Sequence, residues 1–220
     1  MHAVGIVAAA GSGLRLGAEL PKALVPLAGR PLVCWAVDAL RAGGVAEVVV
    51  AVPGAERAAF AAVLSPDVVL VDGGATRTAS VRAALAVTGH GADVVLVHDA
   101  ARPLTPPDVV ARVLAALADG ARGVVPVLPV VDTVVTVDDE DLVTGAVPRE
   151  PLRRVQTPQG FERATLLAAY AALDENADLT DDAAVVRALG VPVSTVAGDE
   201  RGAKVTVAHD LEIAELQVKA

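Results

Sequence analysis

Aromatic residues and cysteine are scarce in this sequence. Only 2% of its 220 residues are aromatic, with one tryptophan, one tyrosine and two phenylalanines, and Cys34 is the single cysteine. One cysteine excludes a disulfide framework within the chain and a cysteine-rich metal site. It also agrees with a reducing compartment, so we expect a cytoplasmic location. The core must be built mainly from alanine, valine and leucine.

The chain also lacks a long uncharged stretch and an excess of basic residues. Its longest segment without Lys, Arg, Asp or Glu is the first 14 residues, whereas a membrane-spanning helix needs about 20 apolar residues. The formal net charge is −9, and no basic stripe of the kind that binds nucleic acid is present. We therefore expect neither a membrane nor a nucleic-acid partner. Isolated cations beside Gly, Pro and Asp favour a small anionic ligand.

Apolar runs of strand length alternate with helical patterns through most of the chain. The runs are continuous rather than alternating, which is typical of parallel strands covered on both faces. This βα rhythm predicts a doubly wound α/β layer. Strands are expected within residues 2–9, 46–53, 67–74, 92–103, 121–130 and 192–198. Helices are expected within 31–43, 56–64, 77–88, 106–120, 163–173 and 208–219, with a short helix after a cap at Thr180.

The rhythm breaks after about residue 130. Two β-like pieces flank the acidic turn DDED at 138–141, and this pattern predicts an inserted hairpin at about 131–150. A two-stranded ribbon is marginally stable alone, so its apolar residues favour packing against a second subunit. A hairpin folded back on its own domain is the alternative. No repeat, low-complexity tract or linker is present, and a single domain over residues 1–220 is expected.

A glycine-rich loop follows the first expected strand. Gly11 and Gly13 have the spacing of a dinucleotide-binding turn, but the third glycine position is Leu16 and no acidic residue ends the second strand. The G-K-[ST] ending of a phosphate-binding ATPase loop is also missing. What remains is A-A-G-x-G-x-R followed by P-K. Arg15 and Lys22 on one such loop can both reach a triphosphate.

Further polar motifs stand where strands are expected to end, which is where open α/β sheets bind ligands. In GGATRTAS (73–80), Ser80 either caps the following helix or bonds a ligand. In VHDAARP (97–103), Asp99 is either a turn residue or a ligand that holds Mg²⁺ against phosphates, since hard cations prefer carboxylate oxygens. Three more loop motifs follow, TPQGF (157–161), TDDA (180–183) and GDERGAKVT (198–206).

As a set, these motifs resemble those of the 2-C-methyl-D-erythritol 4-phosphate cytidylyltransferases of the non-mevalonate isoprenoid pathway. The resemblance covers nearly the full chain and rests on seven motifs in the same order, AAGSGLRLG, PKAL, GGATRTASV, HDAARP, TPQGF, TDDA and KVT. It implies a Rossmann-like nucleotidyltransferase fold, with a mostly parallel doubly wound sheet and an inserted β-hairpin arm that makes a homodimer. It also implies cytidylyl transfer from CTP to methylerythritol phosphate, release of pyrophosphate and a need for Mg²⁺.

The resemblance further implies roles for individual residues. Arg15 and Lys22 match cations that stabilise charge on the triphosphate, and Arg149 and Lys204 match cations that hold the attacking phosphate. Asp99 matches a position in the substrate and metal region. The other positions expected to contact substrate are Ala9, Ala10, Gly11, Gly13, Gly74, Ser80, Ala100, Arg102 and Thr180, together with Thr133, which the arm offers to the partner's site.

The expected reaction has no proton to move, because a phosphate monoester is already a nucleophile near neutral pH. Catalysis is then mostly charge neutralisation and alignment of two polyanions, and His98 is expected to be structural. Three alternatives stay open. They are a ribitol 5-phosphate cytidylyltransferase, which shares CTP, a guanylyl- or other sugar-phosphate nucleotidyltransferase, and a catalytically silent nucleotide-binding module.

Overall fold

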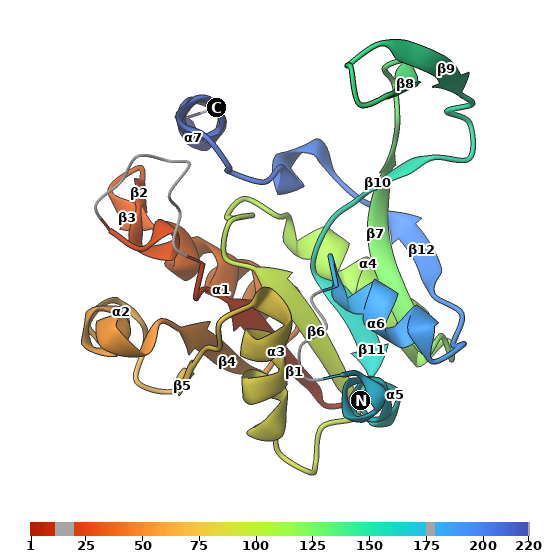
Figure 1. The fold of residues 1–220 in the computed structure, drawn as a ribbon. Helices are drawn as coiled ribbons and strands as arrows, with labels where there is room; N and C mark the ends of the chain where they lie inside the picture. The colour runs from red at the N-terminus through yellow and green to blue at the C-terminus, as the bar shows by residue number, and fades with distance from the viewer. Residues whose placement is uncertain (12–19, 175–178, 220) are drawn as a thin grey trace.

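The fold is built around a twisted β-sheet (Figure 1). The loops that the sequence predicts to bind ligand follow the ends of its strands. The computed structural model describes residues 1–11, 20–174 and 179–219. Within these residues the main sheet has eight strands in the order β10-β7-β11-β6-β1-β4-β5, with β12 beside β7. The strands are β1 (Ala3–Ala8), β4 (Glu47–Val52), β5 (Val69–Asp72), β6 (Val94–Asp99), β7 (Gly123–Pro129), β10 (Arg153–Val155), β11 (Gln159–Glu162) and β12 (Ser194–Ala197).

The sheet is mostly parallel, as the continuous apolar runs predict. Strands β6, β1, β4 and β5 pair in parallel, and β12 runs parallel to β7. Strand β11 is antiparallel to both β6 and β7, and β10 is antiparallel to β7. After β7 the chain enters the hairpin and returns without a crossover helix, which is why β10 and β11 run in the opposite direction.

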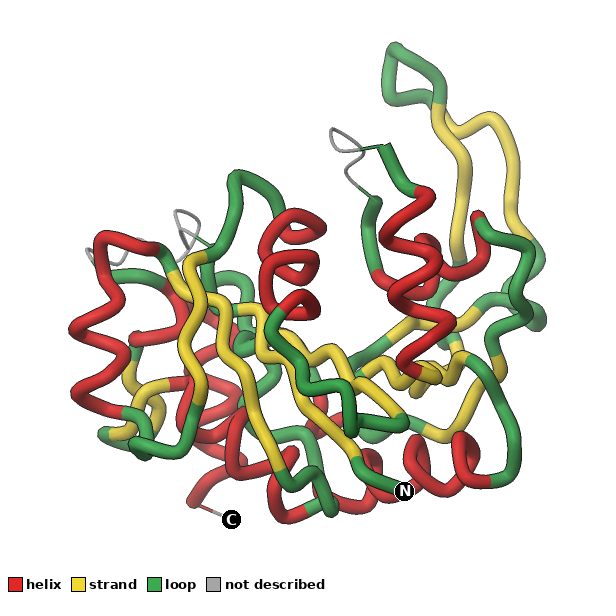
Figure 2. The backbone as a smooth tube through the Cα atoms, turned by 90° about the horizontal axis from the view of Figure 1, so that it is seen from below, coloured by secondary structure: helices red, strands yellow, loops and turns green. Residues whose placement is uncertain are grey.

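Helices cover both faces of the sheet (Figure 2). One face packs against α1, α2 and α4 in a cluster that includes Val7, and the other packs against α3, α5 and α6 in a cluster that includes Ile6. Neighbouring residues of β1 thus point into separate cores, as in any strand. The helices are α1 (Leu32–Ala42), α2 (Arg57–Val63), α3 (Arg77–Ala86), α4 (Pro107–Ala118), α5 (Arg163–Ala172), α6 (Asp182–Ala188) and α7 (Ala208–Lys219).

Two features differ from the sequence-based expectation. Helix α6 is capped by Asp181, not by Thr180, because the Asp181 carboxylate accepts a hydrogen bond from the Ala184 backbone N–H at 2.8 Å. A small hairpin of β2 (Pro26–Leu27) and β3 (Arg30–Pro31) precedes α1 and packs beside α7. In the part of the chain that the structure describes, no helix has the length and apolar character to cross a membrane.

The inserted hairpin is present and projects from the end of β7 (Figure 1). Its strands β8 (Val134–Val137) and β9 (Val143–Val147) pair antiparallel, and the acidic turn between them is closed by backbone N–H groups that donate to the Asp138 carboxylate. The hairpin does not fold back on its own domain. Five of its large apolar residues stay 44–67% exposed, namely Val131, Val135, Val137, Leu142 and Val143.

Candidate active site

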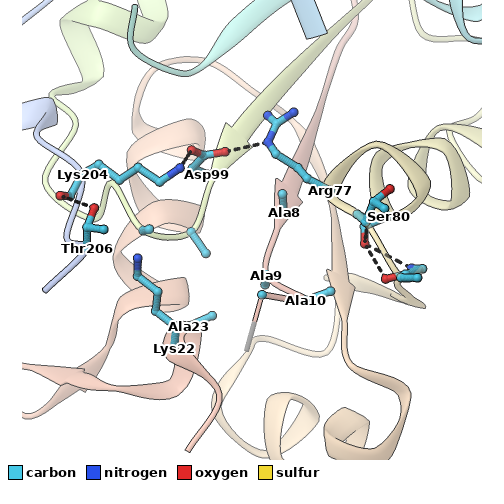
Figure 3. Close-up of a pocket in the computed structure, with 16 residues that line it drawn as sticks. Ala8, Ala9, Ala10, Lys22, Ala23, Arg77, Ser80, Asp99, Lys204 and Thr206 are labelled. Carbon is cyan, nitrogen blue, oxygen red and sulfur yellow. Dashed lines mark hydrogen bonds and ion pairs between the residues drawn. The ribbon is translucent and has the colours of Figure 1, made fainter. Parts of the chain in front are cut away.

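A pocket of about 640 Å³ lies at the carboxyl ends of β1 and β6 (Figure 3). These strands are neighbours in register, with Ala8 opposite Asp99, so the loops that follow them meet at one edge. The short helix η2 (Lys22–Leu24), the start of α3 and the segment before α7 complete the wall. The lining residues are Ala8–Gly11, Lys22, Ala23, Gly74–Arg77, Ser80, Asp99–Ala101, Lys204 and Thr206.

The pocket gathers most of the residues that the resemblance singled out. Those among its lining residues are Ala9, Ala10, Gly11, Lys22, Gly74, Ser80, Asp99, Ala100 and Lys204. Gly13 and Arg15 lie outside the described residues. Arg102, Thr133, Arg149 and Thr180 do not line the pocket of this chain. Their roles in substrate binding stay predictions.

Small residues let the loop after β5 pack tightly against the loop after β1. A Cβ atom at Gly73 would lie 2.5 Å from the Ala10 Cβ and 2.8 Å from the Ser80 Oγ. Ser80 does not cap α3, because that role belongs to Thr76, whose hydroxyl accepts from the Ala79 backbone N–H at 3.1 Å. Instead the Ser80 hydroxyl accepts from the Gly74 N–H at 3.1 Å, which fixes this loop at the pocket wall.

The Asp99 carboxylate forms ion pairs with two cations in the pocket. Its Oδ1 accepts from Arg77 Nε at 3.1 Å, and its Oδ2 accepts from Lys204 Nζ at 2.8 Å (Figure 3). Burial by itself raises the pKa of Asp99, but the charges of Arg77 and Lys204 outweigh it and hold that pKa well below its usual range. Asp99 is therefore ionised at every pH at which the fold is expected to work.

Arg77 is the charged pocket residue that the sequence-based site prediction did not include. It lies within GGATRTAS, a motif in which only Gly74 and Ser80 were given roles. One signal was available, since Arg77 is the first residue of α3 and a cation there opposes the helix dipole. Such a placement needs carboxylates nearby, and the structure supplies Asp99 and Asp182.

The pocket offers little to hold a metal ion by itself. Asp99 is the acidic residue among the described lining residues, and both of its oxygens are bonded to cations. Among the described residues, no three His, Cys, Asp or Glu side chains gather as a metal site. This donor set fits Mg²⁺ only as an ion carried largely by substrate phosphates and water, which is a common way for Mg²⁺ to bind with nucleotides. The metal role of Asp99 stays a prediction.

His98 is buried and bonded on both ring nitrogens. Its Nε2 donates to the Arg102 carbonyl at 3.2 Å, so its Nδ1 is the acceptor. This Nδ1 accepts a hydrogen bond from the Thr157 hydroxyl, with the two heavy atoms 2.8 Å apart. The same Thr157 oxygen accepts from the Asp99 backbone N–H at 3.0 Å. Through Thr157, the His98 ring therefore helps to fix the backbone of Asp99. This is the structural role expected for His98.

The buried His98 should make stability depend on pH. Burial lowers its pKa from 6.5 to about 4, so between these values the unfolded state binds more protons than the folded state. The free energy of unfolding must then fall as the pH falls from about 6.5 to 4. Asp99 acts in a lower window, because its lowered pKa stabilises the fold above about pH 3.8 and that contribution is lost only below it.

Urea unfolding of the wild type and of His98→Gln at several pH values checks this prediction. Glutamine keeps a donor for the Arg102 carbonyl but does not titrate, so its unfolding free energy should change less between pH 6.5 and 4. The same slope in both proteins would contradict the assignment of a buried neutral imidazole.

Lys204 is positioned by clamps on the segment before it. Arg102 donates from Nη1 to the Gly202 carbonyl at 2.7 Å and from Nη2 to the Val155 carbonyl at 3.3 Å. The buried Gln156 amide makes paired hydrogen bonds with the Asp199 backbone at 2.8 and 3.0 Å. In this chain the described bonds of Arg102 are therefore those of a clamp on the main chain.

The arm carries two predicted site residues away from this pocket. Thr133 and Arg149 are exposed and stand on either side of β8 and β9. The Arg149 guanidinium donates to the Val131 carbonyl, so it braces the base of the arm. Thr180 is exposed just before the Asp181 cap.

The comparisons with known proteins agree along the whole chain. Residues 3–220 match the family model for 2-C-methyl-D-erythritol 4-phosphate cytidylyltransferase. Proteins of that name from Nocardia farcinica and Saccharopolyspora erythraea are both 51% identical, over 96% and 98% of this chain and 92% and 98% of theirs. The crystal structure of the Thermus thermophilus protein of that name superposes with a TM-score of 0.82 at 40% identity, covering 100% of both chains. The resemblance and the fold class are confirmed, and the chain belongs to the 2-C-methyl-D-erythritol 4-phosphate cytidylyltransferase family.

Proposed function

We propose that the protein transfers a cytidylyl group from CTP to 2-C-methyl-D-erythritol 4-phosphate in the non-mevalonate isoprenoid pathway. The products are 4-diphosphocytidyl-2-C-methyl-D-erythritol and pyrophosphate. The observation that carries the proposal is the pocket at the ends of β1 and β6 in a chain of this family. Its lining includes three cations, Lys22, Arg77 and Lys204, and one carboxylate, Asp99. A net cationic pocket in a chain of charge −9 suits polyanionic substrates. The single cysteine supports a cytoplasmic location.

The charge distribution suggests how the pocket divides between two substrates. The lining residues Ala9, Ala10, Gly11, Gly74 and Ala75 are small and leave room for a ring system, so we place the base and ribose of CTP there. Lys22 lies beside them and would neutralise the triphosphate, together with Arg15 of the loop outside the described residues. Lys204 and Asp99 form the other side, where we place the acceptor phosphate.

The chemistry then requires alignment more than proton transfer. The acceptor phosphate attacks the α-phosphorus of CTP and pyrophosphate leaves, so the cations Lys22 and Lys204 would share the negative charge that develops. Mg²⁺, when bound, withdraws charge from the phosphate oxygens. His98 takes no proton, because both ring nitrogens are already bonded inside the protein.

Pyrophosphate release tests the reaction and the acceptor together. We expect release only when CTP, Mg²⁺ and methylerythritol 4-phosphate are all present, and none when GTP or ATP replaces CTP. Ribitol 5-phosphate is the matched acceptor control, because it is also a polyol phosphate. Release with ribitol phosphate alone would overturn the acceptor assignment. Absence of release with either acceptor, despite CTP binding, would favour the silent module.

We also propose that the working form is a homodimer joined through the arm. The arm exposes five apolar side chains and keeps Thr133 and Arg149 away from its own pocket, and both facts are explained if a second copy covers the arm. In a two-fold dimer, Arg149 of the partner subunit would then reach the acceptor phosphate beside Lys204. This assignment would bring Arg149 of the partner subunit to the same site as Lys22 and Lys204.

Mixing two inactive variants tests the shared site. Lys22→Ala and Arg149→Ala should each be nearly inactive alone. After the two are unfolded and refolded together, mixed dimers contain one intact site, so activity should return to about a quarter of the wild-type value. A mixture that stays as inactive as its components would show that Arg149 does not act across an interface.

A further inference from the structure

The only tyrosine of the chain is buried and is joined through Asp182 to Arg77 of the pocket wall, and nothing in the mechanism above uses it. Tyr170 lies in α5 with 5% of its surface exposed. Its hydroxyl donates to Asp182 Oδ1 at 2.6 Å, and the Asp182 side chain is fully buried. Burying a carboxylate costs free energy unless it is bonded to donors or cations, so the Tyr170 hydrogen bond offsets part of the cost of burying Asp182.

The second oxygen of Asp182 leads into the pocket. Arg77 Nη2 donates to Asp182 Oδ2 at 2.7 Å, while Arg77 Nε donates to Asp99 Oδ1 at 3.1 Å. Lys204 Nζ donates to Asp99 Oδ2 at 2.8 Å. Four consecutive contacts thus join Tyr170 to Lys204, and we call this chain of side chains the relay. Its members come from α5, α6, α3, β6 and the segment before α7.

The planar guanidinium makes this arrangement directional. Arg77 bonds different carboxylates through Nε and Nη2, so the position of Asp182 sets the plane of the fork and hence the direction of Nε toward Asp99. Asp182 in turn is held on one side by Arg77 and on the other by the Tyr170 hydroxyl. Burial and the Asp182 charge both raise the pKa of Tyr170, which keeps it protonated as a donor.

We propose that Tyr170 is a positioning residue for the acceptor side of the pocket, acting through Asp182 and Arg77 to fix Asp99 and Lys204. The inference rests on the proposed function, because it assigns the Lys204 side to the acceptor phosphate. It gives Tyr170 and Asp182 no contact with substrate. Arg77 belongs both to the relay and to the Gly74–Ser80 segment placed beside CTP. The small residues Ala9, Ala10 and Gly74 make none of the four contacts, so CTP binding should be less affected than acceptor binding.

Steady-state kinetics of Tyr170→Phe provide the main test. The variant keeps the ring in the core and removes only the donor to Asp182. We expect kcat/KM for methylerythritol 4-phosphate to fall about 10- to 100-fold, as for loss of a hydrogen bond to a charged group. KM for CTP should stay within about twofold of the wild-type value, because equal loss on both substrates is the mark of a general structural defect.

Ala169→Gly is the matched control. Ala169 is buried in the same turn of α5, and glycine there loosens the helix while leaving the Tyr170 hydroxyl in place. If the control lowers Tm as much as Tyr170→Phe but leaves kcat/KM for the acceptor unchanged, the positioning role is supported. If the two variants show the same acceptor kinetics, the positioning role is overturned.

A spectroscopic readout tests the relay independently of turnover. Because Tyr170 is the single tyrosine, the absorbance of tyrosinate reports on it alone, and the single tryptophan, Trp35, reports on the fold through its fluorescence. The charged groups around the phenol are Asp182, Arg77 and Arg82. We expect no tyrosinate signal near pH 10, the ordinary range for tyrosine, while Trp35 fluorescence stays native. Asp182→Asn should bring the titration to lower pH.

The outcomes separate the two proposals. An active wild type whose tyrosine titrates near pH 10 in the native fold overturns the relay and leaves the proposed function standing. An inactive wild type whose tyrosine resists titration overturns the proposed function, and with it the positioning role, although the buried pair exists.

Discussion

Lys22→Ala is expected to lower kcat about 10²- to 10³-fold, which corresponds to about 2.7–4 kcal/mol of lost transition-state stabilisation. Lys22 opens the short helix η2 directly after Pro21, and it lines the pocket beside Ala9 and Ala10. Figure 3 shows its side chain extending toward the side of the pocket that holds Asp99 and Lys204. A cation there faces the phosphates on which charge grows as pyrophosphate leaves, so the loss should fall on kcat more than on KM.

Lys219→Ala is the control for this substitution. Lys219 is a lysine on α7 whose side chain is 71% exposed and whose contact with Glu215 is 3.9 Å long. Its removal should leave kcat unchanged. Near-normal turnover in Lys22→Ala, with pyrophosphate release measured at saturating CTP and acceptor, would remove Lys22 from the catalytic residues.

Asp99→Asn should both destabilise the protein and abolish most activity. Asparagine leaves Arg77 and Lys204 without the carboxylate that they share, and breaking a buried ion pair by removing one partner costs about 3–5 kcal/mol. We expect a loss near the lower end, because the Lys204 side chain is 44% exposed and water can reach it. The measurement is the urea unfolding free energy at neutral pH.

Two comparisons sharpen that measurement. Asp38→Asn removes the carboxylate of an exposed pair with Arg30 at 2.6 Å and should cost less than about 1 kcal/mol. Adding pyrophosphate should restore part of the stability of Asp99→Asn, since an anion in the pocket takes over the partners of the lost charge. Equal losses in the two variants would show that Asp99 is an ordinary surface acid.

The sequence predicts the sheet well because burial on both faces leaves a local signal. In β6 all six residues are buried, and the run VVLVHD reads as a strand without any knowledge of its neighbours. The hairpin β2–β3 left no such signal. Its turn uses Ala28 and Gly29 at positive φ (49° and 77°), where an Asn-Gly pair would have been recognised.

The motifs predict most of the pocket but not its internal bonding. Gly74, Asp99 and Lys204 were placed together because each follows a strand or stands in a family motif. The Arg77–Asp182 pair spans 105 positions in the sequence, and no local pattern encodes such a contact. Arg102 is the opposite case. Its motif predicts a substrate contact, whereas the described hydrogen bonds of Arg102 go to backbone carbonyls.

The acidic tip of the arm has a consequence for solubility. A two-stranded ribbon has two open edges whose unpaired backbone groups can template strand addition, and valine-rich ribbons are prone to it. Here the exposed valines of β8 and β9 are interrupted by Asp138–Asp141, four consecutive carboxylates at the tip of the arm. The repulsion between these carboxylates opposes the pairing of one exposed arm with the arm of another chain. The same turn that closes the hairpin thus opposes edge-to-edge aggregation through the exposed arm.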